Sequence, residues 1–151
     1  FPEPTHTVLK VPFKVAGREV AVVFDEEHDH VPGRIHAGMW VFDVSDVANI
    51  LPLSMFHVSE LDSPYSRIGR FGAHQPAERM VDTLVYASWF SGGLRIIDIA
   101  DPMLPREVGS FIPEPSAGQG SPQSNDVDVD ARGLIYLLDR HQGVDILEYD
   151  R

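Results

Sequence analysis

The sequence predicts an all-β fold in which one antiparallel unit is used three times, and a recurring phrase is the first observation behind this prediction. The phrase begins with glycine and occupies residues 38–46, 93–101 and, in a shorter form, 143–150. Its glycines, Gly38, Gly93 and Gly143, lie 55 and 50 positions apart, a period that indicates a repeat architecture. β-Branched and other apolar residues fill each copy, which favours strands over helices.

The second observation is that further strand-like runs accompany each phrase in a constant order. A first run opens each unit, at residues 6–11, 74–80 and 125–130. Another run lies directly before the phrase, at residues 19–24, 83–90 and 133–138, and a last run follows it at 53–58 and 106–112. Residues 91–93 and 140–143 suit the hairpin turns between these strands. Four antiparallel strands in roughly 50 residues is the size of one β-propeller blade.

The third observation is that the last unit is incomplete, because the chain reaches Arg151 after only three strands of it. We therefore predict a β-propeller fragment of about three four-stranded antiparallel blades, the last without its outer strand. It forms one partial propeller over residues 1–151, with blades at 5–58, 72–112 and 124–151. Propellers usually close with roughly four to eight blades, so we expect the remaining blades from the same protein or from a second copy. We also expect the natural protein to extend before Phe1 and to end near Arg151.

Composition excludes several classes of function. The net charge is −11 and the 12 Lys and Arg residues are scattered, which argues against a nucleic-acid partner. Cysteine is absent, so disulfides, thiolate nucleophiles and cysteine-based metal centres are excluded. No apolar run approaches the roughly 20 residues of a membrane span. No glycine-rich phosphate loop occurs either, and we expect no nucleotide cofactor.

Several segments resemble a known family of repeat proteins. Residues 93–102 and 105–111 are similar to LVIVD-repeat proteins of bacteria and archaea, and residues 124–136 with 143–148 resemble the closing blade of such proteins. This resemblance implies a β-propeller that is secreted, periplasmic or on the cell surface. It suggests a binding or interaction module with a protein or glycan ligand. Residues 84–89 and 93–102 also resemble the selenium-binding protein and methanethiol oxidase propellers, whose oxidases are linked to copper held by histidines.

One candidate site lies at the start of the first strand of each unit. His6, His74 and the pair Asn125 and Asp126 occupy corresponding places there. The first strand of a blade lines the central channel, so these side chains are expected to converge and to offer ligands to a transition metal. This predicts, as an alternative to a binding module, a copper- or iron-type oxidoreductase or a hydrolase, with Glu78 or Asp126 as the base. The competing interpretation is that these groups only hydrogen-bond to neighbouring blades and to water.

A second candidate site is the acidic loop at residues 25–36, where the other units have tight turns. It contributes His28, His30 and His36 beside several carboxylates, a composition that suits a transition metal or simple solvation. The acidic run at 125–130 suggests calcium, but its alternation with Val127 and Val129 favours a strand.

Other repeated residues are interpreted as structural. Asp43, Asp98 and Glu148 occupy the same position in the three phrases, and we expect their carboxylates to cap the following turns. Aromatic residues such as Trp40 and Trp89 are expected to pack between blades.

Overall fold

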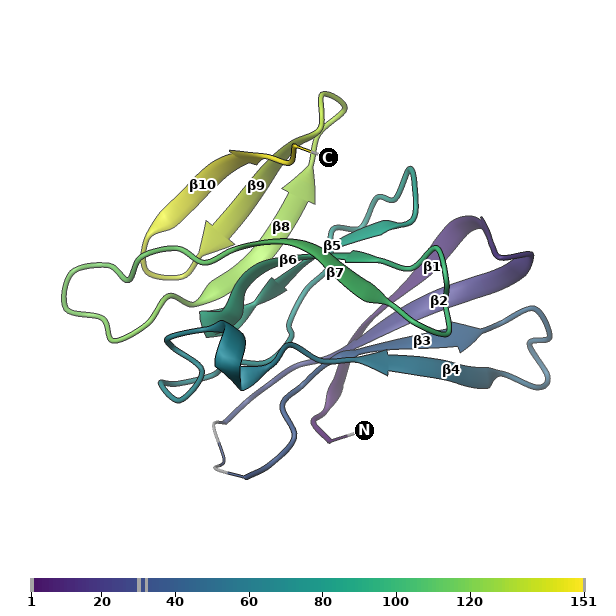
Figure 1. Ribbon diagram of the computed structural model, residues 1–151, viewed down its shortest axis with the longest axis horizontal. Coiled ribbons are helices and arrows are strands. Elements are labelled where there is room, and N and C mark those ends of the chain that lie inside the picture. Colours follow the sequence, from purple (N-terminus) through teal and green to yellow (C-terminus); the bar gives the residue numbers. More distant parts are fainter. Residues whose placement is uncertain (1, 30, 32, 151) are drawn as a thin grey trace.

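The protein consists of three antiparallel sheets that lie one after another along the chain (Figure 1). The structure is a computed structural model that describes residues 2–29, 31 and 33–150. The first sheet has the order β1 (Thr5–Val15), β2 (Arg18–Asp25), β3 (Met39–Asp43) and β4 (Leu51–Phe56). The second contains β5 (Leu84–Trp89), β6 (Gly93–Asp98) and β7 (Arg106–Phe111). The third contains β8 (Ser124–Val129), β9 (Leu134–Asp139) and β10 (Gly143–Glu148).

The predicted all-β propeller fragment is confirmed. Within the described residues the sheets do not close into a ring, and the only helices are two 3-10 turns, η1 (Glu60–Asp62) and η2 (Phe90–Gly92). No described helix has the length and apolar character that a membrane crossing requires. Each sheet is a meander of consecutive strands, as expected for a blade, and the third sheet ends at β10 with no fourth strand among the described residues.

The second sheet differs from the prediction at its inner edge. Residues 74–80 were expected to form a full strand, but they form only an isolated bridge between Pro76 and Ala87. Backbone bonds from His74 N to Ser88 O and from Ala77 N to Tyr86 O, of 3.0 and 2.8 Å, still hold this segment against β5. Proline has no N–H to give to a ladder, which explains why regular pairing stops there.

Two apolar cores lie between neighbouring sheets, so the second sheet contributes to both. One core joins the first and second sheets around Trp89, whose ring makes edge contacts with Phe24 and Phe56 at centroid distances of 5.9 and 6.0 Å. The other joins the second and third sheets through Leu94, Ile96, Val127, Ile135 and Leu137. Face-to-face packing of sheets by buried aromatic and aliphatic residues confirms the predicted role of Trp89.

The repeated carboxylates act at turns, as predicted, in two of the three phrases. Asp43 Oδ1 accepts from Ser45 N at 2.9 Å, and Asp98 Oδ1 accepts from Ala100 N at 2.9 Å. Gly93, which opens the second phrase, has φ of 75°, and a Cβ there would collide with the carbonyl oxygen of Phe111. Both features fix the turns on either side of the strand that carries the phrase.

Candidate functional site

The inner edges of the three sheets are irregular at corresponding positions. The ladder between β1 and β2 shifts register between Thr5 and Thr7, and the ladder between β8 and β9 shifts between Ser124 and Asp126. Each shift leaves one residue out of the pairing, His6 in the first sheet and Asn125 in the third. Register shifts of this kind turn a side chain out of the pleat and are frequent beside functional sites. His74 lies at the matching place in the second sheet, where Ser88 O accepts from its N–H.

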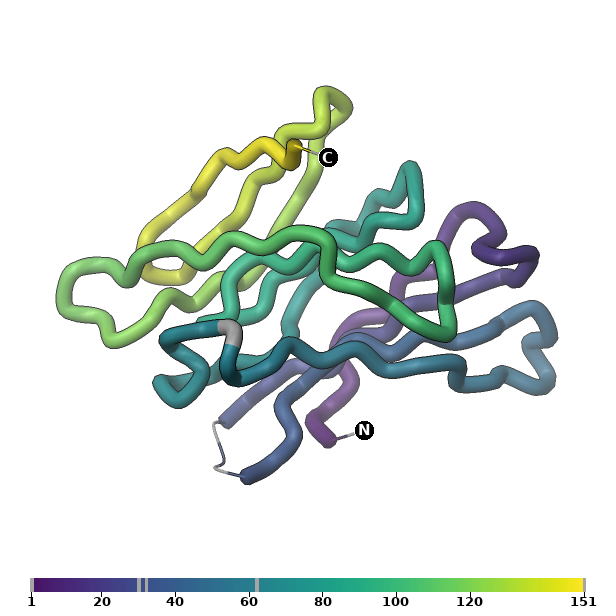
Figure 2. Tube along the Cα trace, in the orientation of Figure 1, coloured from purple at the N-terminus to yellow at the C-terminus, as the bar shows by residue number. Residues whose placement is uncertain are grey.

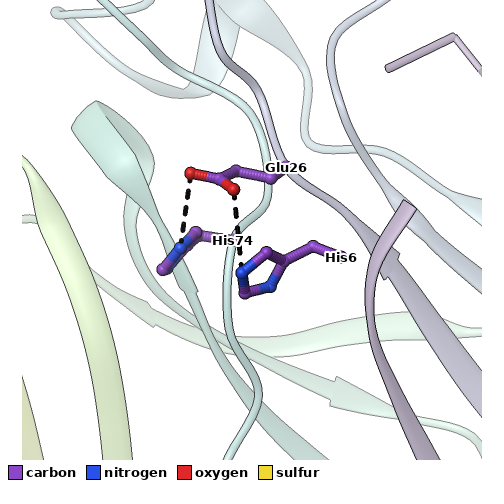
Figure 3. Close-up of side chains that lie close together, drawn as sticks. All are labelled: His6, Glu26 and His74. Atoms are coloured by element: carbon purple, nitrogen blue, oxygen red, sulfur yellow. Dashed lines mark ion pairs between the residues drawn. The ribbon is translucent and has the colours of Figure 1, made fainter. Parts of the chain in front are cut away.

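Glu26 joins two of these residues into one cluster (Figure 3). It lies directly after β2, where its N–H donates to Pro4 O at 2.9 Å and fixes the backbone. Its Oε2 is 3.7 Å from His6 Nε2, and its Oε1 is 3.6 Å from His74 Nε2. One ligand atom from each of the three side chains lies within 4.8 Å of the others. The expected convergence of His6 and His74 is therefore present, with a carboxylate between them.

Hydrogen bonds on the far side of each ring assign the tautomers. His74 Nδ1 lies 2.5 Å from Asn125 O, and because a carbonyl oxygen can only accept, this Nδ1 carries the proton. His6 Nδ1 lies 2.7 Å from Thr7 Oγ1, whose own proton goes to Gln75 Oε1 at 2.9 Å, so His6 Nδ1 also donates. In their neutral forms both rings consequently present an unprotonated Nε2 lone pair to Glu26.

Burial favours the neutral form of His74. Only 10% of its side chain is exposed, and desolvation is the largest cause of a lowered pKa. The Asn125 carbonyl and Glu26 oppose this shift of the pKa, and the neighbouring basic side chains of His6 and Arg140 add to it. The ring is also held between His6 and Phe90, with centroid distances of 4.8 and 4.9 Å.

Three further basic groups surround the cluster. His28 Nε2 is 3.3 Å from Glu26 Oε2, and an Arg70 guanidinium nitrogen is 3.6 Å from Glu26 Oε1. Arg140 donates through Nε to Asn125 Oδ1 at 2.5 Å. His28, which was predicted as a metal ligand, therefore lies beside the cluster, while 56% of its side chain is exposed.

The donor set and its spacing suit a divalent transition metal. Two imidazole nitrogens and one carboxylate are common ligands of zinc and of non-haem iron. Ligand atoms about 2.1 Å from a tetrahedral ion lie about 3.4 Å apart. Here one ligand atom from each side chain lies within 4.8 Å of the others, and the two oxygens of Glu26 lie 3.7 Å from His6 Nε2 and 3.6 Å from His74 Nε2. The backbone carbonyl of Asn125 supplies the outer hydrogen bond that orients a metal-binding histidine.

His36, another predicted ligand, belongs to a separate and closed group. Its Nδ1 lies 2.6 Å from Glu27 Oε2, and its Nε2 lies 3.0 Å from Glu60 Oε1. The hydrogen bond to Glu27 is the largest cause of a raised pKa for His36. Both ring nitrogens have carboxylate partners, so the ring has no nitrogen left for an ion in this arrangement. His30, also predicted as a ligand, lies outside the described residues.

The two predicted bases lie away from the cluster. Asp126 is exposed, and its Oδ1 accepts from the neighbouring Val127 N at 2.9 Å. Glu78 is exposed and lines a shallow pocket with Asp128. The structure places Asn125 at the site through its backbone carbonyl, and the acidic run after it forms β8, with Val127 in the core. The expected strand is thus confirmed.

Glu26 and Arg70 were missed by the sequence interpretation. Glu26 was one of several carboxylates in the 25–36 loop, and only its place directly after β2 separates it from the rest. Arg70 lies in the long connection between β4 and β5 that Figure 2 traces outside the sheets, where no repeat gives it a register. In comparisons with known proteins, no family model matches this sequence, and no curated protein matches it. The resemblance to LVIVD-repeat proteins stays a prediction.

Proposed function

We propose that this chain is part of a larger LVIVD-type β-propeller whose His6, His74 and Glu26 bind a transition-metal ion, and that the complete site is a metal-dependent oxidoreductase or hydrolase. One observation carries this proposal: two imidazoles from different sheets, each with its Nδ1 engaged by another partner, direct Nε2 at the same carboxylate, so that one ligand atom from each of the three side chains lies within 4.8 Å of the others. Three protein ligands also leave positions for water and substrate, as catalytic sites do.

The protein side of the chemistry follows from the contacts. A divalent ion here would polarise a substrate oxygen or lower the pKa of a bound water. Asn125 and Thr7 hold the two rings in orientation through Nδ1. Phe90 is fully buried and covers one side of His74, which limits water on that side. Glu26 keeps 17% of its side chain exposed, so a small molecule can approach the cluster from solvent.

Metal titration of the purified protein tests this proposal. Calorimetry with Zn²⁺ or Fe²⁺ alone is expected to give one ion per chain. Glu26→Gln keeps the shape of the side chain and removes the charged ligand, so we expect metal affinity to fall about a hundredfold, with a similar fall in His74→Ala. His141→Ala is the matched control, because this histidine is exposed in the turn between β9 and β10. Failure of the wild type to bind metal, or equal binding by Glu26→Gln, overturns the proposal.

A second function, as an interaction module, is supported by the uncovered face of the third sheet. Val144 and Ile146 on β10 are 58% and 63% exposed, which is unusual for β-branched residues of a strand. We propose that further blades, from the same protein or a second copy, pack against this face, and that the completed propeller presents a surface to a protein or glycan ligand. No nucleic acid is expected as a partner.

The oligomeric state tests whether a second copy completes the ring. Sedimentation of the wild type is expected to show a closed oligomer, and Ile146→Asp is expected to shift it to monomer. Val47→Asp is the control, because Val47 is 84% exposed in the turn between β3 and β4. A wild type that is monomeric at all concentrations assigns the missing blades to the rest of the natural protein and rules out the second copy.

A further inference from the structure

Two arginines gather beside the cluster in a chain whose net charge is −11. The guanidinium carbon of Arg70 lies 3.9 Å from the centroid of the Phe90 ring, and that of Arg140 lies 5.9 Å from the same centroid. The two guanidinium carbons are therefore less than about 10 Å apart. Phe90 in turn packs on His74 at 4.9 Å, which places both positive groups next to the metal-binding histidine.

This pair of like charges is only partly compensated. Arg70 has 22% of its side chain exposed, and its pKa is lowered first by burial and then by the charge of Arg140. The charges of Glu26, Glu27 and Asp29 oppose this shift of the pKa, and Glu26, 3.6 Å from Arg70, is shared with His6, His28 and His74. Like charges near a low-dielectric surface repel one another and attract an anion.

Among the residues that the structure describes, both guanidinium groups keep donors for a ligand. The 3.6 Å separation of Arg70 and Glu26 is longer than a hydrogen bond, so the N–H groups of Arg70 are not hydrogen-bonded to Glu26 and can donate to a ligand. Arg140 uses Nε for Asn125 Oδ1, and its two terminal amino groups remain beyond that bond. Asn125 therefore orients Arg140 with its side chain and His74 with its backbone carbonyl.

We infer that the substrate of this site is a small molecule with an oxyanion group, a carboxylate or a phosphate, which Arg70 and Arg140 bind beside the metal. This inference rests on the proposed metal-dependent function and adds the substrate class to it. Guanidinium forks match the paired oxygens of both groups and form strong charge-assisted hydrogen bonds. Binding there would leave the neighbouring part of the substrate next to His6, His74 and Glu26. Cationic and purely apolar substrates are disfavoured by the same two charges.

Anion titrations of the zinc-loaded protein test the inference after free zinc has been removed. The probes are inorganic phosphate and acetate, each added alone, so that the two sources of an oxyanion are distinguished. Arg70→Gln and Arg140→Gln are expected to weaken binding of the preferred probe about tenfold to a hundredfold. Arg106→Gln is the matched control, since Arg106 is exposed at the start of β7 and carries the same charge. Its affinity for the probe is expected to stay within about twofold of the wild type.

The outcomes separate this inference from the proposed function. Arg70→Gln is expected to bind Zn²⁺ at least as tightly as the wild type, because it removes a positive charge near Glu26. If zinc binds but neither phosphate nor acetate binds, or if both arginine variants bind the anion like the wild type, the anion inference is overturned while metal binding stands. If the wild type binds no metal, the proposed function itself is overturned.

Discussion

Glu26 and Glu27 are neighbours in the sequence, yet their carboxylates have opposite surroundings. Glu27 is 1% exposed and accepts from His36 Nδ1 at 2.6 Å, Phe71 N at 3.0 Å and Ala37 N at 3.3 Å. Glu26 has four basic groups at 3.3 to 3.7 Å, farther away than the His36 and Phe71 nitrogens that donate to Glu27. A carboxylate whose lone pairs accept short hydrogen bonds stabilises the fold, whereas one surrounded by basic groups at longer distances is available to a ligand.

The largest expected effect comes from removing the Glu27 carboxylate. Glu27→Ala leaves two buried backbone N–H groups and the His36 ring without their acceptor, so the free energy of unfolding is expected to fall by about 3–5 kcal/mol. Urea unfolding followed by tryptophan fluorescence measures the change. Glu26→Gln is the comparison, and its loss is expected to stay below about 1 kcal/mol. Equal losses of unfolding free energy in the two variants would contradict the difference between a structural Glu27 carboxylate and an available Glu26 carboxylate.

The packing around Glu27 explains why this pair is fixed in place. A Cβ on Gly72 would collide with Glu27 Oε2 and would come within 2.7 Å of Ala37 N. Glu27 N donates to Ala73 O at 3.2 Å, and Ala73 N donates to Ala37 O at 3.0 Å. These bonds join the loop after β2 to the segment before the second sheet, and so they also hold His74 at its distance from Glu26.

The second largest effect is stabilisation by metal, which should depend on Glu26 and not on Glu27. At a Zn²⁺ concentration about 100 times its dissociation constant, binding to the folded state adds about 2.7 kcal/mol to the free energy of unfolding. Thermal unfolding with and without zinc measures this. The increment is expected to disappear in Glu26→Gln and to persist in Glu27→Ala at a temperature where that variant is folded. A zinc increment that survives in Glu26→Gln would place the ion elsewhere.

A smaller effect is the pH dependence that the Glu27 and His36 pair contributes. The pKa of His36 is raised above 6.5, first by its hydrogen bond to Glu27 and further by Glu60, while His57 nearby has a pKa lowered by burial. A raised folded-state pKa gives stability that is fully present below pH 6.5 and is lost as the pH rises through that folded value. The difference in unfolding free energy between the wild type and His36→Asn should therefore decrease as the pH rises from 6.5 through the raised folded-state pKa.

The control for this pH effect is His141→Asn, which changes an exposed histidine far along the chain in the β9–β10 turn. Its difference from the wild type is expected to stay constant over the same interval. A His36→Asn difference that grows with pH would contradict the ion pair between His36 and Glu27.

The repeat made part of the site predictable and left the rest open. His6, His74 and Asn125 could be matched because the three units place them at the same point of the first strand, where the register shifts occur. The repeat does not predict the positions of residues in loops. Glu26 and Glu27 are adjacent loop residues directly after β2, and only the path of the backbone there decides which of them is buried. Strand β2 ends at Asp25. Of the two residues that follow, Glu27 has a buried side chain and Glu26 has its side chain beside His6 and His74.

The smallest expected effect concerns Glu78 and Asp126, the two acids predicted as bases. Both are exposed, and the described contacts of Asp126 are limited to its own strand neighbour. We expect Glu78→Gln and Asp126→Asn to change the free energy of unfolding by less than about 0.5 kcal/mol and to leave zinc affinity unchanged, as at other exposed positions. Zinc affinity is measured by calorimetric titration, and the loss in Glu26→Gln is the reference against which the two variants are compared. A loss of zinc affinity in Asp126→Asn comparable with that in Glu26→Gln would extend the site to the side chains of β8. The hydrogen bonds of Asn125 to His74 and Arg140 would then have to rearrange when the metal binds.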